Sequence, residues 1–283
     1  MSAGLLVRAE TRKLLSRTAA RLGLVVSAVI GLLVPLVLVS VSDEWVINAT
    51  SMRELVPYHA PGGLQWTLEA RNLYILRMLL LVLAASSFAG ELKAGTLKED
   101  LLRPVARPAV LLAKWLALSI YAAMTLLVTL GVASITSVIA FGAEGPWSVP
   151  LVGFGATWLT DVGFVGVALA ISVYVRSVPL SIGATFLLLI LGDMTGLGMW
   201  GLYSLAETLP NAQQHGLLTA AHASYPWLPS TALAAWKGYR PTEPWPFSGL
   251  EGVWHWESFA TLGLMTGLSL LLAAWIFKRT DIS

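Results

Sequence analysis

Two aspartates stand in apolar stretches of the sequence that carry no other charged residue. Asp161 lies in the run 151–175, and Asp193 lies in the run 179–203. A carboxylate at membrane depth is costly, so such residues are candidates for function. Two carboxyl groups that share a proton can act as a general acid and a general base, which is the chemistry of aspartic proteases.

The residues next to these aspartates argue against proteolysis. Presenilin-like proteases carry a G-x-G-D pattern, whereas Ile190 stands in place of the first glycine before Asp193. Asp161 follows Thr160, where that family has a tyrosine. Two interpretations stay open for both carboxylates, which are polar packing in a helix bundle and a role in a substrate path or in gating.

The depth of the two aspartates suggests a common partner. Each lies about ten residues from the outer end of its run, which is about 15 Å at 1.5 Å per residue. Arg77, in the apolar run 73–90, is the candidate counter-ion for Asp161 and Asp193.

The other reactive residue types give no site. The chain has no cysteine, and no lysine follows a glycine, so the phosphate-binding pattern G-x4-G-K-[ST] is absent. The four histidines fall outside the apolar runs and give too few ligands for a metal. A net charge of +2 gives no reason to expect nucleic acid. We therefore expect a non-enzymatic chain with no catalytic, cofactor-binding or metal-binding residue.

The elements that position the aspartates are predicted from composition. Hydrophobic residues make up 56% of the 283 residues and charged residues only 12%, against about 25% charged in soluble domains. A membrane-spanning helix needs about 20 apolar residues, and six runs qualify: 22–41, 73–90, 115–141, 151–175, 179–203 and 256–277. The prediction is an all-α membrane protein with six transmembrane helices, forming a single domain over residues 1–283.

The basic residues set the expected orientation. Thirteen Lys and Arg flank the spans on the side of the two termini, against four on the other side, and such an excess marks the cytoplasm. We expect both termini to be cytoplasmic in a multi-pass plasma (inner) membrane protein. The basic N-terminal stretch 1–21 is expected to form an amphipathic helix on the lipid surface.

The loop between spans 2 and 3 shows helix signals. Thr96 and Glu99 fit a capping box, and a short amphipathic helix is expected from Leu97 to Arg103, where Pro104 ends it. A helix this short is marginal in water, so we expect it to dock on lipid, on the N-terminal segment or on a partner protein.

The outer loop 204–255 contains two apolar stretches, 216–225 and 228–236. Each is too short to span a bilayer. We expect short extracytoplasmic helices there, between spans 5 and 6, which either dip into the outer interface or are re-entrant. An ordinary extracellular cap is the alternative.

Three motifs carry a family resemblance. The loop 91–114 reads E-x3-GTL-x3-LL-x-P-x2-R-x5-AK, the C-terminus reads FKRTDI, and the N-terminal segment reads AETRKL. Together with six spans and cytoplasmic ends, these motifs resemble ABC-2 type transporter permeases, the membrane-spanning subunits of ABC transporters.

The resemblance implies a mechanical role. In that family the loop helix is a coupling helix that docks on a separate ATPase subunit, which holds the ATP and magnesium. The implied contact residues are Glu91, Gly95, Thr96, Leu97, Leu101, Leu102 and Arg103. The implied assembly is a permease homodimer with two ATPase copies, which exports an unknown substrate. The alternative function is a force-transmitting anchor that acts with the ATPase on an extracytoplasmic partner without moving a substrate.

Overall fold

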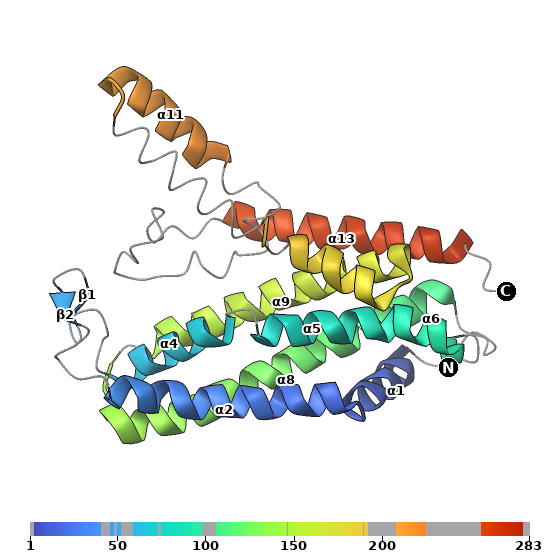
Figure 1. Cartoon of the computed structure of the whole chain (residues 1–283), viewed down its shortest axis with the longest axis horizontal. Helices are drawn as coiled ribbons and strands as arrows, with labels where there is room; N and C mark the ends of the chain where they lie inside the picture. The colour runs from blue at the N-terminus through green and yellow to red at the C-terminus, as the bar shows by residue number, and fades with distance from the viewer. Residues whose placement is uncertain are drawn as a thin grey trace.

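The computed structural model describes residues 3–40, 46–47, 50–51, 59–72, 75–97, 106–145, 147–188, 190–191, 208–224 and 256–279. These residues are mainly helical, and most of the helices run roughly side by side in one bundle (Figure 1). Two short strands, β1 (Val46–Ile47) and β2 (Thr50–Ser51), form an antiparallel ladder. The helical elements are α1 (Ala3–Leu15), α2 (Thr18–Ser40), α4 (Ala60–Asn72), α5 (Ile75–Ala85), η1 (Ser86–Gly90), α6 (Glu91–Ala94), α8 (Arg107–Phe141), α9 (Ser148–Val175), α11 (Asn211–Ser224) and α13 (Trp256–Arg279).

Four helical stretches are long and apolar enough to cross a membrane. They are Thr18–Ser40, Arg107–Phe141, Pro150–Val175 and Phe259–Arg279. The stretches Ala60–Asn72 and Leu76–Ala94 form a fifth span if this pair, bent by 43°, is counted as one. The described residues therefore form a multi-pass helical membrane protein with four or five candidate spans. The sixth stays a prediction, because only the apolar helix Val178–Leu188 and residues 190–191 of the run 179–203 are described.

The apolar runs 22–41 and 73–90 predict that residues 42–72 between them form an outer loop. This prediction is wrong from residue 60 onward. Residues 60–72 form α4, which packs against α2, α8 and α9. Leu64 and Thr67 of this helix are fully buried. If α4 and the helix after it are counted as one span, this span begins within the stretch 42–72, and its two parts are bent by 43° against each other.

Helices α2 and α8 approach closely because α2 presents small residues along one side. Gly23, Ser27 and Gly31 follow at intervals of four and are buried. A Cβ atom added at Gly31 would lie 3.0 Å from the carbonyl oxygen of Thr129. Small residues at such spacing let the backbones of membrane helices meet, and here they seat α2 on the longest helix of the bundle.

Glycines also position α13 against α9. A Cβ atom at Gly163 would lie 2.5 Å from the Leu262 side chain, and one at Gly166 would lie 2.7 Å from the Thr266 methyl group. The last helix thus depends on two glycines of α9 for its contact with the bundle.

Both described chain ends lie at the same end of the bundle, near α6 (Figure 1). At the opposite end, α4 and the strand pair lie beside the far ends of α2 and α8. Helix α11 projects away from the bundle (Figure 1), and it lies within the predicted extracytoplasmic region 204–255. The second stretch predicted to be helical there, 228–236, lies outside the described residues.

Candidate functional site

Segments far apart in the sequence meet at the end of the bundle that holds the chain ends. An apolar cluster there joins Phe88, Leu97, Val110 and Phe277, which come from η1, the start of the loop, α8 and α13. The rings of Phe88 and Phe277 meet edge to face, with centroids 5.1 Å apart. The N-terminal motif lies at the same end, where Glu10 and Lys13 of α1 contact Lys114 and Glu91.

Arg107 connects the start of α8 with the end of α13. Its guanidinium donates hydrogen bonds to the backbone carbonyl oxygens of Phe277 (3.2 Å) and Lys278 (3.3 Å). The guanidinium also lies 6.0 Å from the centroid of the Phe277 ring. The last carbonyls of a helix lack partners within the helix, so Arg107 completes the end of α13 and ties the loop motif to the C-terminal motif.

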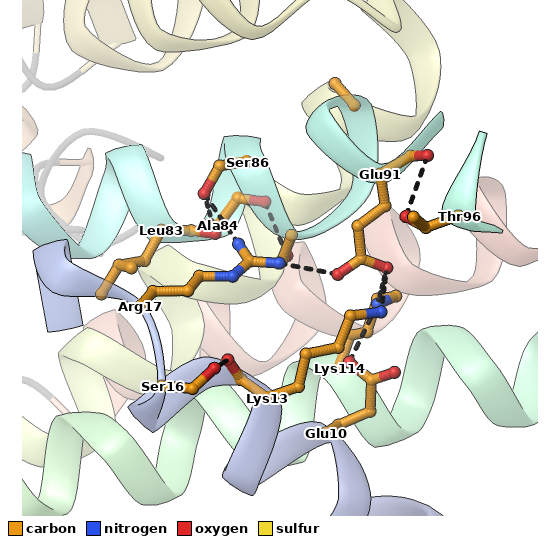
Figure 2. A network of polar contacts seen from close by, with 12 residues as sticks. Glu10, Lys13, Ser16, Arg17, Leu83, Ala84, Ser86, Glu91, Thr96 and Lys114 are labelled. Carbon is orange, nitrogen blue, oxygen red and sulfur yellow. Dashed lines mark hydrogen bonds and ion pairs between the residues drawn. The ribbon is translucent and has the colours of Figure 1, made fainter. Parts of the chain in front are cut away.

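The centre of the site is the carboxylate of Glu91 (Figure 2). Its Oε1 atom lies 2.7 Å from Arg17, and its Oε2 atom lies 2.9 Å from Lys13 and 2.7 Å from Lys114. The Lys114 ammonium also contacts Glu10 at 2.9 Å. Glu91 thereby joins α6 to α1, to the turn after α1 and to α8.

Burial makes this network sensitive to the loss of any member. The exposed fractions of Lys114, Glu91 and Glu10 are 1%, 5% and 8%. A buried charge is tolerated only when it is paired and hydrogen-bonded. Lys114 meets this condition with two carboxylates, and Glu91 meets it with three cations.

The local chain geometry presents Glu91 to its partners. The π-helical turn η1 directly precedes it, and the Ser86 hydroxyl in this turn accepts a hydrogen bond from Arg17 at 3.0 Å. Gly95 has φ of +76°, a left-handed conformation that suits glycine, and it ends α6. The chain therefore turns four residues after Glu91.

The residues of the predicted ATPase contact fall into three groups. Glu91 and Leu97 point inward, with Leu97 fully buried, so the structure gives both an intramolecular role. Gly95 is half-buried and Thr96 is exposed, with the Thr96 hydroxyl donating to the Glu91 carbonyl oxygen at 3.4 Å. Leu101, Leu102 and Arg103 lie outside the described residues, as does Glu99 of the predicted capping box. Their contact with a second subunit stays a prediction.

A second charged site lies deeper in the bundle, where α4 ends. The guanidinium of Arg71 lies 2.7 Å from Asp161 Oδ2, and both side chains are fully buried. Arg71 also donates to Asn72 (2.9 Å) and to the Thr125 hydroxyl (3.2 Å), and Asn72 donates to the Thr157 hydroxyl at 3.2 Å. The cluster joins the broken second span to α8 and α9.

This geometry revises the predicted counter-ion of Asp161. Arg71, which lies before the predicted span 73–90, forms the ion pair with Asp161. Arg77 is buried in α5, and Asp193 lies outside the described residues. Arg71 escaped sequence analysis because Glu69, Arg71 and Asn72 lower the hydropathy of the stretch before residue 73.

Sequence reasoning also missed the partners of Glu91. The signal was present in part, because Glu91 and Lys114 both belong to the loop motif and Glu10 belongs to the N-terminal one. No pattern within one helix could have paired them, since Glu10 and Lys114 are 104 residues apart. In the described part of the chain, no group of three or more His, Asp or Glu side chains is arranged to hold a metal ion.

Comparison with known proteins gives one family. The family model described as ABC-2 family transporter protein matches residues 72–282. The match runs from the end of α4 through α13 and includes Glu91, Lys114 and Asp161. No curated protein sequence matches the chain.

Proposed function

Since the chain belongs to the ABC-2 transporter family, we propose that it is the permease subunit of an exporter driven by a separate ATPase subunit. ATP and magnesium would bind in that ATPase, and the permease would contribute no catalytic residue. The substrate would cross between helices of this chain and those of a second copy.

The observation that carries the proposal is the convergence on Glu91. The loop 98–105 follows the described residues Thr96 and Leu97 directly, and on its other side Ala106 and Arg107 follow it. Through Glu91, Leu97 and Arg107, a displacement of this loop would act on α1, α8 and α13. A docked ATPase could therefore move several helices by pushing on one short segment.

The arrangement of the chain ends supports the proposed topology. Both described ends lie at one end of the bundle (Figure 1), which supports an even number of membrane crossings. Helix 178–188, continued by the apolar residues up to 203, would supply the sixth crossing. The excess of Lys and Arg would place the end of the bundle that holds the chain ends on the cytoplasmic side of the plasma (inner) membrane.

Helix α11 supports the second candidate function, that of an anchor acting on an extracytoplasmic partner. It projects from the bundle (Figure 1), and Asn211, Gln213, His215 and Thr219 are exposed. In this alternative, the ATPase would pull on the partner through α11.

Co-purification tests the proposed contact with the ATPase. We expect the wild-type permease, purified in mild detergent from its native membrane, to bring an ATPase with it in equal amount. Leu101→Asp should release the ATPase, since it puts a charge on the apolar side of the helix that the sequence predicts from Leu97 to Arg103. Leu101→Met is the matched control, because it keeps an apolar side chain of similar volume.

Two results would contradict the proposal. One is an unchanged complex with Leu101→Asp, and the other is a purified permease that carries no ATPase. Stimulation of the ATPase by a small molecule would favour export, whereas stimulation only by an extracytoplasmic protein would favour the anchor.

A further inference from the structure

The helix that carries Glu91 changes its winding just before this residue. Residues 86–90 form the π-helical turn η1 between the α-helices α5 and α6. Such turns are rare, contain one residue more than an α-helical turn and occur often at functional sites. Directly after η1, the Glu91 N–H bonds to the carbonyl oxygen of Phe88, three residues earlier.

A serine of α9 takes part in the hydrogen bonding of this turn. The Ser172 hydroxyl accepts a hydrogen bond from the Ala89 N–H at 3.1 Å and donates one to the Ala85 carbonyl oxygen at 3.1 Å. Residues four apart, such as Ala85 and Ala89, bond directly to each other in an α-helix. Ser172 is fully buried, and its hydroxyl bridges the two backbone groups instead.

The extra residue determines where Glu91 points. One residue corresponds to a rotation of about 100° and a rise of about 1.5 Å in an α-helix. If Ala89 bonded directly to Ala85, the chain after it would turn by about this angle. The carboxylate of Glu91 would then leave Arg17 and Lys114, which it contacts at 2.7 Å in the present winding.

We propose that Ser172 is a positioning residue that holds the π-helical turn and thereby directs Glu91 toward α1 and α8. The effect of Ser172 on helix winding is independent of any partner. Its consequence for coupling rests on the proposed function. A helix of the bundle, α9, thus controls whether the loop that follows Glu91 is linked to α1.

The surroundings of Gly90 in η1 leave room for one added methyl group. A Cβ atom at Gly90 would meet Ser86 at 3.5 Å and Val178 at 3.8 Å, which are ordinary van der Waals distances. Gly90→Ala is therefore a matched control that changes the composition of the turn without a clash. Deletion of Gly90 is the opposite change, because it removes the extra residue and leaves the residues on either side in place.

Thermal unfolding of the purified permease in detergent tests the winding directly. In the wild type, Glu91→Gln should lower the melting temperature by about 4 °C or more, because the cations lose their charged partner. In the Ser172→Ala background, Glu91→Gln should lower the melting temperature by less than half as much, since Glu91 no longer faces Arg17 and Lys114 there. Equal effects of Glu91→Gln in both backgrounds would overturn the proposal.

A deletion separates positioning from simple loss of packing. Removing Gly90 from Ser172→Ala gives a regular α-helix in which Glu91 again faces Lys114, so the full effect of Glu91→Gln should return. Gly90→Ala in the same background should not restore it. If Ser172→Ala alone does not fold, recovery of folded protein by the deletion supports the proposal, and failure to recover overturns it.

Activity of the complex with its ATPase gives a separate result. Ser172→Ala should lower stimulated ATP hydrolysis while the ATPase stays bound, and Ser172→Thr, which keeps a hydroxyl, should retain most of it. If unfolding shows the predicted coupling but stimulated hydrolysis is unchanged, the positioning role stands and the proposed function of the loop fails.

Discussion

At the scale of single residues, Glu91 has two oxygen atoms and three cations within 2.9 Å. Two of the cations belong to α1 or to the turn after it, and their side chains are 35% and 24% exposed. Lys114 is the buried member of the set. Exposed pairs contribute little because water screens them, so most of the electrostatic stabilisation should come from Lys114.

We therefore expect Lys114→Met to destabilise the protein more than any other single loss of a basic residue in this network. The change leaves Glu10 without its cation and Glu91 with only its two more exposed partners. Breaking a buried ion pair typically costs about 3 kcal/mol. Denaturant or thermal unfolding in detergent measures the cost. Lys93→Met, at an exposed site two residues after Glu91, is the control and should be nearly neutral, and a similar loss in both variants would contradict this account.

The pair of Arg71 and Asp161 gives a prediction of the same kind. Asp161→Asn should lower the melting temperature, because the change leaves the buried Arg71 without a counter-charge. Arg71→Gln should do likewise, and the double variant should be less destabilised than the sum of the two. The control is the double variant of Arg77→Gln and Asp161→Asn, in which the two destabilisations should add more nearly than those of Arg71→Gln and Asp161→Asn. If Arg71→Gln and Arg77→Gln showed equal coupling to Asp161→Asn, Arg77 would again be a candidate counter-ion of Asp161, as the sequence predicts.

The same variants separate a structural role from one in a substrate path. Asparagine keeps the shape of Asp161 and removes its charge. If the carboxylate serves only packing, variants that are folded and bound to the ATPase should keep the activity of the complex. Loss of activity in folded Asp161→Asn would assign the residue to the path or to gating.

The sequence could predict part of both charged sites. It marked Asp161 through its apolar surroundings, and it marked Glu91 and Lys114 through the spacing of the loop motif. It could not supply their partners, because Arg71 and Asp161 lie 90 positions apart and meet only when α4 packs on α9. Hydropathy also misleads at Arg71. It counts this residue as charged and therefore favours a loop, although the charge is neutralised by Asp161 inside the bundle.

At the scale of helices, the contact of α2 with α8 depends on Gly23, which has no side chain. The hydroxyl of Tyr121 donates to the Ala20 carbonyl oxygen at 2.8 Å. A Cβ atom at Gly23 would lie 2.0 Å from this hydroxyl oxygen and 3.3 Å from the Tyr121 Cζ atom. Gly23→Ala must therefore displace the tyrosine or part the helices.

We expect Gly23→Ala to cost about 1–3 kcal/mol of folding stability, the usual range for overpacking. Tyr121→Phe removes the clashing oxygen, so the double variant should recover part of the loss. Gly131→Ala in α8 is the control, because no atom lies within 4 Å of its added Cβ and alanine favours a helix. Melting temperatures in detergent measure all four. An unaffected Gly23→Ala would mean that α2 is not held in this position.

Hydropathy predicted where these membrane helices lie, but it could not predict the bend after α4 or the π-helical turn η1. The runs 115–141, 151–175 and 256–277 lie within α8, α9 and α13 with ends shifted by no more than eight residues. The run 73–90 contains α5 and the π-helical turn η1, and α4 before it is bent by 43° against the helix that follows. That turn depends on Ser172, 83 residues after Ala89, and no local propensity encodes a contact of this range.

At the scale of the whole molecule, the ends of the chain and the motif residues 91–97 share one end of the bundle (Figure 1). From sequence, thirteen Lys and Arg are assigned to that side and four to the opposite side, and one of these four, Arg71, is buried inside the bundle. The inference from charge therefore becomes stronger once the buried pair is set aside. Which side of the membrane this end faces is a prediction that labelling can test.

Cysteine labelling is well suited to this chain, because it contains no cysteine. We expect Lys93→Cys and Lys278→Cys, both at exposed positions near the chain ends, to react with a membrane-impermeant maleimide only after the cells are permeabilised. Glu144→Cys, exposed between α8 and α9, and Gln213→Cys in α11 should react in intact cells. Ala60→Cys, at a fully buried position, should stay unlabelled in both conditions and serves as the control. Labelling of Gln213→Cys only after permeabilisation would put α11 in the cytoplasm. That result would contradict both the six-span topology and the proposed extracytoplasmic contact. With α11 in the cytoplasm, α13 would cross to the outside and end on the side opposite to α1, which requires an odd number of crossings.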